Sequence, residues 1–455
     1  MDLKPLFEPK AMAVIGVSLS NDRHPASVVY FKNHLRGPLD VYAVNPKGGK
    51  LHGETVYPSI KDIPRKIDLA AIVTRAESTP QVMMDCIEAG VKSAIVISGG
   101  FTEKGRDDLQ NRLVDIARDA DFPFIGPNCL GIYVPNRVDT FSAPLERMVR
   151  LRPGGVAFIS QSGGIAIDQM IKFYGHGVGV SRMVSIGNKA LIREKEMLDY
   201  LIKDPATKVI AYYIEGFSPG EGREFVLAAQ HSKKPIVILK AGKTEAGNRA
   251  VTSHTASLAG DYASFSSVIA QHHILEASSE NELASFCAAL NSYTTAIAGN
   301  VGIITCSGGH GALAVDECSL AGLNVPQLSE RTLAEMRGNV TESIRDIASI
   351  NNPADLTGSA VDDDVVACAN VMAAAPELDC VIVLMLPYTP GISLDIGARL
   401  SSLSKKFNKP FIAYVPHMEK YDMLIAGFQF NGIPVSPSIE GAVLMAKALA
   451  RKKPC

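Results

Sequence analysis

The chain has 455 residues, of which 47% are hydrophobic, and its 45 Lys and Arg side chains nearly balance 47 Asp and Glu side chains. This apolar content excludes a largely disordered chain. The near-neutral charge, without a long basic run, argues against a nucleic-acid or anionic-membrane partner. At roughly 150 residues per domain, the length predicts about three domains.

Targeting signals and cysteine usage indicate the compartment. The first residues, MDLKPLFEPK, lack the apolar core of a signal peptide, and no apolar run approaches the roughly 20 residues of a membrane span. The 8 cysteines are scattered without a CxxC pair, which favours reduced thiols in a cytoplasmic protein over a disulfide framework or a zinc ribbon. The histidines have no metal-ligand spacing, so we predict no metal site.

Short aliphatic or β-branched runs alternate with longer helical patterns along the whole chain. Continuous apolar runs of this length are typical of strands buried on both faces, and the alternation predicts parallel sheets with crossover helices. The sequence therefore predicts an α/β fold with several doubly wound sheets. The expected strands are residues 13–17, 41–44, 69–73, 93–97, 156–160, 209–214, 235–239, 301–305, 380–386 and 410–415.

Two stretches are predicted to be domain boundaries. Residues 134–155 carry no clear period and are rich in proline and glycine, and residues 296–301 separate a long helical pattern from a fresh strand. We therefore expect three domains, over residues 1–140, 141–297 and 298–455.

An internal echo links the second and third expected domains. GGVAFISQSGGIAIDQM (154–170) is similar to GNVGIITCSGGHGALAVDE (299–317), and KKPIVILK (233–240) is similar to NKPFIAYV (408–415). Each pair has the same order of strand, turn and helix, or the same Lys-Pro before a strand. The echo predicts two copies of one flavodoxin-like unit.

The first strand runs into Gly16-Val17-Ser18 and a polar turn before a helix. Free N–H groups and the helix dipole make such a turn a candidate anion site, although an ordinary strand-to-helix turn has the same pattern. The full GxGxxG spacing is absent, and the second strand is followed by Lys47 rather than ended by an acidic residue. Lysine there suits a phosphate better than a ribose hydroxyl, so a nicotinamide-dependent dehydrogenase is disfavoured.

Two Ser-Gly-Gly turns follow strands in the echoing segments. Each has the design of an anion site at a helix start, and their repetition indicates that both helices point at one shared phosphate. Glycines needed only for packing at tight turns are the alternative. The turns are Ser162-Gly163-Gly164 and Ser307-Gly308-Gly309.

A small, polar segment, AGKTEAGNRAVTSHTASLAG, lies between the strand ending at Lys240 and a helix beginning near Asp261. It is too polar for a core and too long for a simple connection, so it is predicted to be a functional loop. Its imidazole, His254, is either a base, nucleophile or phosphoryl carrier, or an inert loop histidine. Glu215 ends the strand VIAYYIEG, where it is either a hydrogen-bond partner for an imidazole or a solvated carboxylate.

These motifs occur in an order that resembles the α subunit of NDP-forming (ADP-forming) acyl-CoA synthetases, relatives of succinyl-CoA synthetase. The resemblance covers essentially the whole chain. It implies an N-terminal Rossmann-like CoA-binding domain followed by two flavodoxin-like doubly wound domains. The motifs are SGGFTEKG (98–105), GPNCLG (126–131), SQSGG (160–164), YYIEG (212–216), KAGKTEAG with SHTASLAG (240–260), CSGGHGAL (306–313) and NNPADLTG (351–358).

The resemblance implies a ligase that interconverts acyl-CoA, ADP and phosphate with a carboxylic acid, CoA and ATP. An acyl phosphate would form, His254 would carry its phosphoryl group, and Glu215 would hold the phosphohistidine. The two Ser-Gly-Gly turns would stabilise the phosphate. Coenzyme A would lie near Gly16, Ser18, Lys47, Ser98, Gly99, Gly100, Phe101, Pro127 and Asn128.

The family's ATP-grasp domains have no counterpart in these residues, and no Walker-type loop replaces them. The resemblance therefore implies that ADP or ATP, with Mg²⁺, binds on a separate ATP-grasp β subunit in an α2β2 assembly. The sequence identifies neither the small carboxylic acid nor the direction of the reaction.

Three departures from the family pattern leave a second function open. Ala256 stands where the family usually has glycine, Leu191 and Arg193 stand where relatives often carry acidic residues, and His310 stands where proline is frequent. The alternative is a non-catalytic protein that binds CoA or acyl-CoA on the same scaffold.

Overall fold

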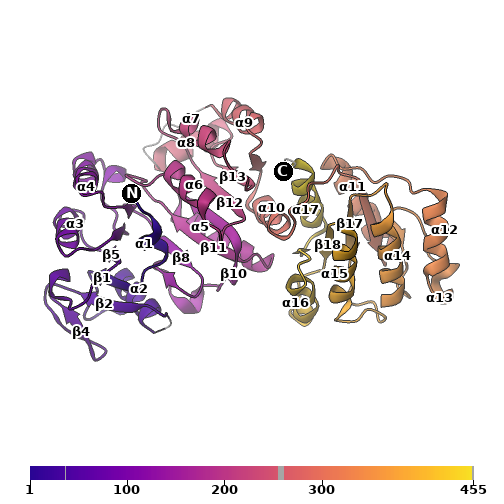
Figure 1. Cartoon of the computed structure of the whole chain (residues 1–455), viewed down its shortest axis with the longest axis horizontal. Helices are drawn as coiled ribbons and strands as arrows, with labels where there is room; N and C mark the ends of the chain where they lie inside the picture. Colours follow the sequence, from indigo (N-terminus) through magenta and orange to yellow (C-terminus); the bar gives the residue numbers. More distant parts are fainter. Residues whose placement is uncertain (36, 255–260, 453–455) are drawn as a thin grey trace. The chain divides into compact units, whose positions relative to one another are not determined.

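A computed structural model describes residues 1–35, 37–254 and 261–452, and only the backbone of residues 252–254. The chain forms two compact units (Figure 1). The first comprises Met1–Tyr174 and Gly179–Glu276 and holds two sheets, and the second comprises Gly175–Val178 and Ala277–Cys455 and holds the third sheet. Within the described ranges, none of the helices combines the length and apolarity that crossing a membrane requires.

The first sheet has the strand order β3-β4-β2-β1-β5-β6-β7. From β2 to β7 the strands are parallel, as in a Rossmann-like domain. Alternate residues of β1 serve opposite faces: Met12 and Val14 share a core with α2, whereas Ala13 and Ile15 share one with α3 and α4. The elements are α1 (Lys4–Phe7), β1 (Ala11–Ile15), α2 (Pro25–His34), β2 (Asp40–Val44), β3 (Gly49–Leu51), β4 (Glu54–Tyr57), β5 (Leu69–Ile72), α3 (Thr79–Glu88), β6 (Ser93–Val96), α4 (Asp107–Asp119) and β7 (Phe124–Ile125).

The second sheet has the strand order β14-β13-β12-β10-β11-β8-β9. Its strands β13, β12, β10 and β11 are parallel, and β8 and β9 add an antiparallel edge. Ile159 packs with α6 and α7 on one face, and Phe158 packs on Phe173 of α5 on the other. The elements are β8 (Gly131–Val134), β9 (Val138–Asp139), β10 (Pro153–Ser160), α5 (Gly163–Gly175), β11 (Val180–Ser185), α6 (Glu194–Lys203), β12 (Val209–Ile214), α7 (Glu221–Ala229), β13 (Ile236–Lys240), α8 (Glu245–His254), α9 (Tyr262–Gln271) and β14 (Leu275–Ala277).

One continuous apolar core joins the two sheets of the first unit. It extends from Phe7 and Tyr30 beside the first sheet to Tyr212 and Ile238 in the second. Phe7 of α1 stacks on Tyr200 of α6, with ring centroids 5.0 Å apart. Because close-packed cores resist deformation, the shared side chains hold the strand ends of the two sheets in a fixed relation.

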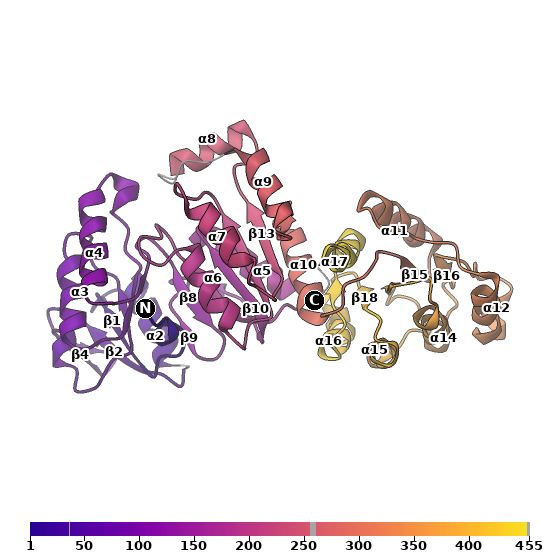
Figure 2. The same ribbon diagram turned by 45° about the horizontal axis from the view of Figure 1, so that its top comes forward.

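The third sheet has five parallel strands in the order β16-β15-β17-β18-β19. Helices α14, α15 and α16 share a core with one face, and α11 and α17 contact the strands as a second layer (Figure 2). The elements are α10 (Glu280–Ser292), β15 (Val301–Thr305), α11 (Gly308–Leu320), α12 (Glu330–Asn339), α13 (Glu342–Arg345), β16 (Ala354–Asp355), α14 (Asp362–Ala374), β17 (Cys380–Leu384), α15 (Ile396–Phe407), β18 (Phe411–Tyr414), α16 (Asp422–Phe430), β19 (Val435–Ser436) and α17 (Ile439–Arg451).

The second and third sheets repeat one flavodoxin-like design. The strand order β13-β12-β10-β11 matches β18-β17-β15-β16. After β10, the Ser160 hydroxyl accepts the N–H two residues later at 3.1 Å, and the Thr305 hydroxyl does the same after β15 at 3.1 Å. Lys234 donates to carbonyls at the end of α6, and Lys409 donates to carbonyls at the end of α14.

The α/β fold and all ten predicted strands are confirmed, with strand ends within three residues of the prediction. Nine of the described strands are missing from the predicted set: eight short ones of two to four residues, and β11, which has six. Its sequence, VSRMVS, breaks the apolar run with Ser181, Arg182 and Ser185, although all six residues are buried. Arg182 is held inside the fold by Asp204 at 3.1 Å, a partner that local sequence does not reveal.

The predicted loop after Lys240 is wrong in part, because α8 occupies Glu245–His254 (Figure 2). Glu245 and Arg249, four residues apart, pair at 2.8 Å on the first turns of this helix. Glycine, asparagine, threonine and serine have low helix propensity, so the composition of this segment hides the helix. Helix α9 follows the capping residue Asp261, as predicted.

The division into three domains at residues 140 and 297 stays a prediction. Strands β8 and β9 precede residue 140 yet pair in the second sheet. Helix α10 precedes residue 297 and lies in the second unit.

Candidate active site

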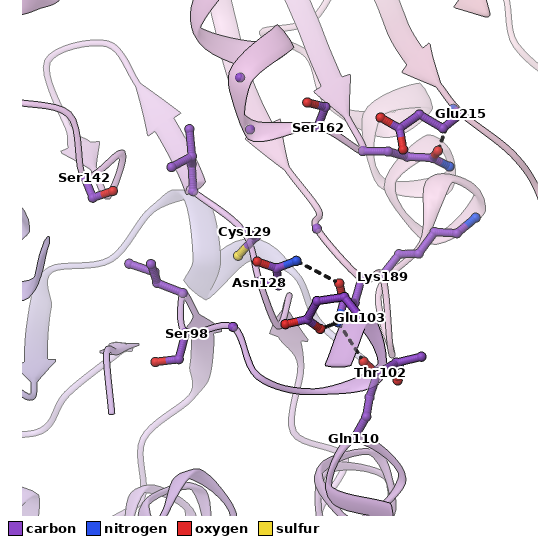
Figure 3. A pocket seen from close by; sticks show the side chains of 18 of the residues that line it. Ser98, Thr102, Glu103, Gln110, Asn128, Cys129, Ser142, Ser162, Lys189 and Glu215 are labelled. Carbon is purple, nitrogen blue, oxygen red and sulfur yellow. Dashed lines mark hydrogen bonds between the residues drawn. The ribbon is translucent and has the colours of Figure 1, made fainter. Parts of the chain in front are cut away.

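A cavity of about 880 Å³ opens in the first unit where strands of both sheets end (Figure 3). The turns after β5, β6 and β7 line one side, and the turns after β10, β11 and β12 line the other. In open α/β sheets, ligands bind at the carboxyl ends of the strands. This cavity, which two sheets supply with polar side chains, is therefore the candidate active site.

The first sheet contributes the turn that begins at Ser98. Glu103 shapes this turn, because its carboxylate accepts the N–H of Gly100 at 2.5 Å and that of Phe101 at 3.2 Å. The Asn128 N–H donates to the Ser98 carbonyl at 2.9 Å, which ties the next turn to this one. Ser98, Gly99 and Asn128 line the cavity as neighbours, as Figure 3 shows for the two labelled side chains.

Asn188, from the turn after β11, joins the two sides of the cavity. Its side-chain amide donates to Glu103 at 2.6 Å and to Gln110 at 3.0 Å, and its carbonyl oxygen accepts from Asn128 at 3.2 Å. Burial works to raise the pKa of Glu103, but the Asn188 amide and the N–H groups of the turn outweigh it, so the pKa is lowered. The Glu103 carboxylate therefore joins the turn after β6 to Asn188 after β11.

Other predicted CoA residues lie outside the cavity lining. Gly16 has φ +101°, and a Cβ there would lie 2.2 Å from the Val73 carbonyl oxygen, so glycine is needed where β1 meets β5. Ser18 builds the turn before α2, where its hydroxyl accepts the Asn21 N–H at 3.1 Å. Lys47 is exposed just after β2. The remaining three are Gly100, which is half-buried, and Phe101 and Pro127, which are buried, and none of them is among the residues that line the cavity.

On the opposite side, Ser162, Gly163 and Gly164 begin α5 and line the cavity. The N–H groups of a first helical turn lack partners inside the helix, so this helix start can stabilise an anion in the cavity. A Cβ on Gly163 would lie 2.9 Å from Leu130 Cγ. The glycine therefore also allows close packing, and both predicted interpretations of this turn have physical support.

Glu215 follows β12 and lines the cavity with only 5% of its surface exposed. Figure 3 shows its side chain on the same side of the cavity as Ser162. The Lys240 amine donates to the Glu215 main-chain carbonyl at 2.7 Å. Burial lowers the pKa of Lys240, and the Glu215 and Glu276 carboxylates partly oppose that effect.

A network of charged side chains contacts the main chain next to Glu215, at the Gly216 carbonyl. The Lys189 amine donates to Glu194 at 3.2 Å and to Glu221 at 3.0 Å. Arg193 donates to the second oxygen of Glu221 at 2.6 Å. Burial alone would raise the pKa of Glu221, but the Lys189 charge and the Arg193 hydrogen bond lower it to about 2. Both carboxylates are thus paired, which offsets the cost of burying charge.

His254, the predicted phosphoryl carrier, ends α8 in the first unit, and its side chain lies outside the described residues. Ala256 also lies outside them. The predicted role of His254 therefore stays a prediction. Leu191 packs in the core of the first sheet with Phe101, so its departure from the family pattern changes the core and not the cavity lining.

The second predicted phosphate turn begins α11 in the second unit. Gly308 and Gly309 are exposed, and the imidazole of His310 lies 3.0 Å from the Ser307 hydroxyl. A Cβ on Gly308 would lie 3.0 Å from a carboxylate oxygen of Asp355. This helix start thus has an acidic side chain next to it, whereas the start of α5 has the apolar Leu130.

Sequence reasoning missed Glu103, Gln161, Lys189, Glu194 and Glu221. Some of their partners are local, such as Glu194 for Lys189, but others lie 54 to 85 residues away, and the sequence does not place those together. One local signal was available: GNKALIREKE, directly after a strand, concentrates charges where open α/β sheets bind ligands. Among the described residues there is no group of three or more His, Cys, Asp or Glu side chains that could hold a metal ion.

Comparison with known proteins defines the class. A model described as "CoA binding domain" matches residues 10–135, and one described as "Succinyl-CoA ligase like flavodoxin domain" matches residues 153–290. The first match spans the strands of the first sheet together with β8, and the second spans β10 to β14 of the second sheet. The turns of these two sheets build the cavity. The fold and site thus define a protein of the succinyl-CoA ligase-like class with a CoA-binding domain.

Individual relatives are more specific. The chain is 34% identical over 462 residues to subunit alpha of acetate–CoA ligase [ADP-forming] II from Pyrococcus furiosus, covering 98% of this chain and 97% of that one. It is 35% identical over 391 residues to acetate–CoA ligase [ADP-forming] I from Archaeoglobus fulgidus, covering 85% of this chain and 55% of that protein. The chain therefore spans about half the length of the latter.

The solved structure of dinucleotide forming acetyl-coenzyme A synthetase 1 from Ca. Korarchaeum cryptofilum, in complex with phosphate and ADP, matches with a TM-score of 0.87 and 32% identity. The match covers 99% of this chain and 96% of that one. This chain belongs to the ADP-forming acyl-CoA synthetase family, in the part that corresponds to the alpha subunit.

Proposed function

We propose that this chain is the α subunit of an ADP-forming acyl-CoA synthetase, which interconverts acyl-CoA, ADP and phosphate with a carboxylic acid, CoA and ATP. The observation that carries the proposal is the cavity of about 880 Å³. It combines a turn of the CoA-binding sheet with Glu215 and the start of α5, a carboxylate and an anion-stabilising helix end. A thioester bound on the first sheet would meet phosphate at this helix end.

In this proposal CoA lies along the turns of the first sheet. Ser98, Gly99 and Asn128 offer a hydroxyl, exposed main chain and an amide to a polar ligand. Glu103 keeps these turns in place through its hydrogen bonds to the main chain, and Asn188 holds the opposite wall against it. Gly16, Ser18 and Lys47 are proposed to contact the nucleotide end of CoA, because a positive side chain and a helix start both favour phosphate.

The phosphoryl transfer is assigned to the second sheet. Phosphate attacks the thioester and releases CoA, which leaves an acyl phosphate, and His254 then takes its phosphoryl group and releases the acid. Glu215 accepts a hydrogen bond from the other imidazole nitrogen, which orients the ring and stabilises its charge. Ser162, Gly163 and Gly164 stabilise the phosphoryl oxygens, and we assign the same role to Ser307, Gly308 and Gly309.

A partner completes the reaction in this proposal. The phosphohistidine gives its phosphoryl group to ADP, with Mg²⁺, on a separate ATP-grasp β subunit in an α2β2 assembly. The alpha-subunit name of the Pyrococcus furiosus relative supports a partner of some kind. Seven cysteines of the described chain are buried as free thiols, which supports a reducing cytoplasm as the compartment.

The test is the formation of ATP from ADP, phosphate and a panel of acyl-CoAs by the full chain together with the ATP-grasp chain that co-purifies with it. We expect turnover with at least one acyl-CoA, which also identifies the acid, and no turnover with His254→Ala. CoA binding by the wild-type chain without turnover would instead support the alternative, a non-catalytic CoA- or acyl-CoA-binding protein.

A further inference from the structure

The main chain at Glu215 is held by a buried amide from the neighbouring strand. The side-chain amide oxygen of Gln161, Oε1, accepts the N–H of Glu215 at 2.6 Å and that of Gly216 at 3.1 Å. The Gln161 nitrogen donates to the Gly216 carbonyl at 2.8 Å. Gln161 is only 8% exposed, so water does not compete freely for these bonds. Three hydrogen bonds from one side chain thus fix the peptide that carries Glu215.

The orientation of the Gln161 amide is itself fixed. Its nitrogen also donates to Glu194, which is 1% exposed, and a carboxylate only accepts hydrogen bonds, so the nitrogen must face it. The other Glu194 oxygen lies 3.2 Å from the Lys189 amine. Lys189 in turn donates to the Gly216 carbonyl at 3.0 Å and closes the loop of contacts. Each member therefore constrains the next.

The charges of this network balance within it. Lys189 and Arg193 supply two positive charges, and Glu194 and Glu221 supply two negative ones. Lys189 and Arg193 are therefore paired with these two carboxylates, and Gln161 contacts Glu215 at its main-chain N–H. Fixing the main chain at Glu215 orients its carboxylate, which a group that must stabilise a cationic or phosphorylated imidazole requires.

The third sheet provides an internal comparison. The ladders of β10 with β12 and of β15 with β17 align the two halves residue by residue. In this alignment Glu215 corresponds to Leu386 and Gln161 to Cys306, and both residues are buried. The third sheet thus forms the same strand order with apolar residues at the positions of Gln161 and Glu215. The strand order therefore requires neither a glutamine nor a glutamate at these two positions.

We propose that Gln161 is a positioning residue that fixes Glu215, and that Glu194 and Lys189 fix the amide of Gln161. The inference rests on the proposed function, in which Glu215 holds the phosphohistidine. Gln161 acts through Glu215, so its loss lowers the rate of phosphoryl transfer and leaves the affinity for CoA unchanged.

The first test compares Gln161→Met with Gln230→Met in the complex with the ATP-grasp chain. Both replace an amide by an apolar side chain of similar length, and Gln230 is an exposed residue at the end of α7. We expect kcat to fall about 10- to 100-fold for Gln161→Met, with a KM for CoA within about twofold of wild type. Gln230→Met is expected to match the wild type in both.

A second variant, Gln161→Glu, keeps the shape and the acceptor oxygen and decides the case if Gln161→Met does not fold. Its second oxygen would face the Glu194 carboxylate on α6, with Lys189 and Glu221 beyond it and Glu215 after β12. Like-charge repulsion raises the pKa of the introduced carboxyl, and its protonated form donates to Glu194 as the amide does. We therefore expect the ratio of variant to wild-type kcat to rise as the pH falls from about 8 to about 6.

The outcomes separate the two proposals. Wild-type kcat in both Gln161 variants, together with its loss in Glu215→Leu, would overturn the positioning role and leave the proposed function intact. A pH-independent ratio for Gln161→Glu would also overturn it, since a merely structural defect does not follow this titration. Undiminished turnover in His254→Ala would overturn the proposed function itself.

Discussion

The second and third sheets are built alike yet differ where their strands end. Both have a hydroxyl three residues before the first residue of the helix, and both have a lysine that donates to a carbonyl at the end of a crossover helix, α6 in the second sheet and α14 in the third. At the carboxyl end of the second sheet, Glu215 lies above a network of buried charges, whereas the equivalent position of the third sheet is Leu386. One scaffold therefore has buried charged and polar residues at this edge in one copy and apolar residues at the equivalent positions in the other.

The difference shows which residues serve the fold and which serve the site. Positions that agree, such as Lys234 and Lys409, complete hydrogen bonds at helix ends that both copies need. Positions that differ, such as Gln161 against Cys306, exchange polar groups for apolar ones at equal burial. Because buried charges rarely add stability over apolar residues, their retention in one copy indicates a functional role.

The largest effect is expected from Glu215→Leu, which gives the second sheet the residue type found at the equivalent position of the third. Turnover should fall by about 100- to 10,000-fold, because no carboxylate remains to orient the imidazole. The scaffold should persist, since the third sheet accepts Leu386 at this position. Steady-state kinetics and the far-ultraviolet circular dichroism spectrum measure the two effects. Turnover near the wild-type rate would contradict the assigned role of Glu215.

Lys189→Met should have the next largest effect, this time on stability. It removes the cation that pairs with both Glu194 and Glu221, and breaking a buried ion pair by removing one partner costs about 3–5 kcal/mol. Lys195→Met is the matched control, because its pair with Asp199 is more exposed and should be worth about 0.5 kcal/mol or less. Urea unfolding of the full chain measures the free energy of unfolding of both variants. Equal losses would show that the buried ion pairs of Lys189 contribute no more to stability than the exposed pair of Lys195.

Glu221 should make the first unit sensitive to acid. Its pKa in the folded chain is lowered to about 2 from its ordinary value of 4.5. A lowered pKa means that the stabilisation is fully present above about pH 4.5 and is lost as the pH falls toward 2, on the order of 3 kcal/mol in total. Hydrogen exchange of the β12 amides across this range measures the loss. In Glu221→Gln the free energy of opening should depend less steeply on pH over this range. An unchanged pH dependence would exclude Glu221 as the source of the acid sensitivity.

The smallest effect concerns the two helix starts. In Gly163→Ala the new methyl would lie 2.9 Å from Leu130 Cγ, so the side chain or the backbone must shift, at a cost of about 1–2 kcal/mol. In Gly309→Ala nothing lies within 4 Å of the new methyl, and alanine should stabilise α11 by about 0.5–1 kcal/mol. Thermal unfolding of the two variants tests this. We expect the unfolding temperature to fall in Gly163→Ala and to rise in Gly309→Ala. A change in the same direction in both variants would contradict the difference in packing.

The sequence predicted the fold well because apolar runs determine buried strands. It missed eight strands of two to four residues, which are too short for a clear apolar run. It also missed β11, where Arg182 and two serines are buried, and α8, whose residues have weak helix propensity. For the candidate site, the strand-end position was enough to place Glu215 and the Ser162 turn at the cavity, and their roles stay predictions. The sequence could not predict the contacts of Gln161 with Glu215 or of Lys189 with Gly216, since these pairs are 54 and 27 residues apart in the chain.

The central claim is that the second sheet carries a phosphoryl group on His254, held by Glu215. The most direct measurement is the intact mass of the full chain after incubation with phosphate and the productive acyl-CoA, in the presence of the ATP-grasp chain and without ADP. The account predicts an acid-labile gain of one phosphoryl group, absent in His254→Ala and strongly reduced in Glu215→Leu. The same gain in His254→Ala would contradict it.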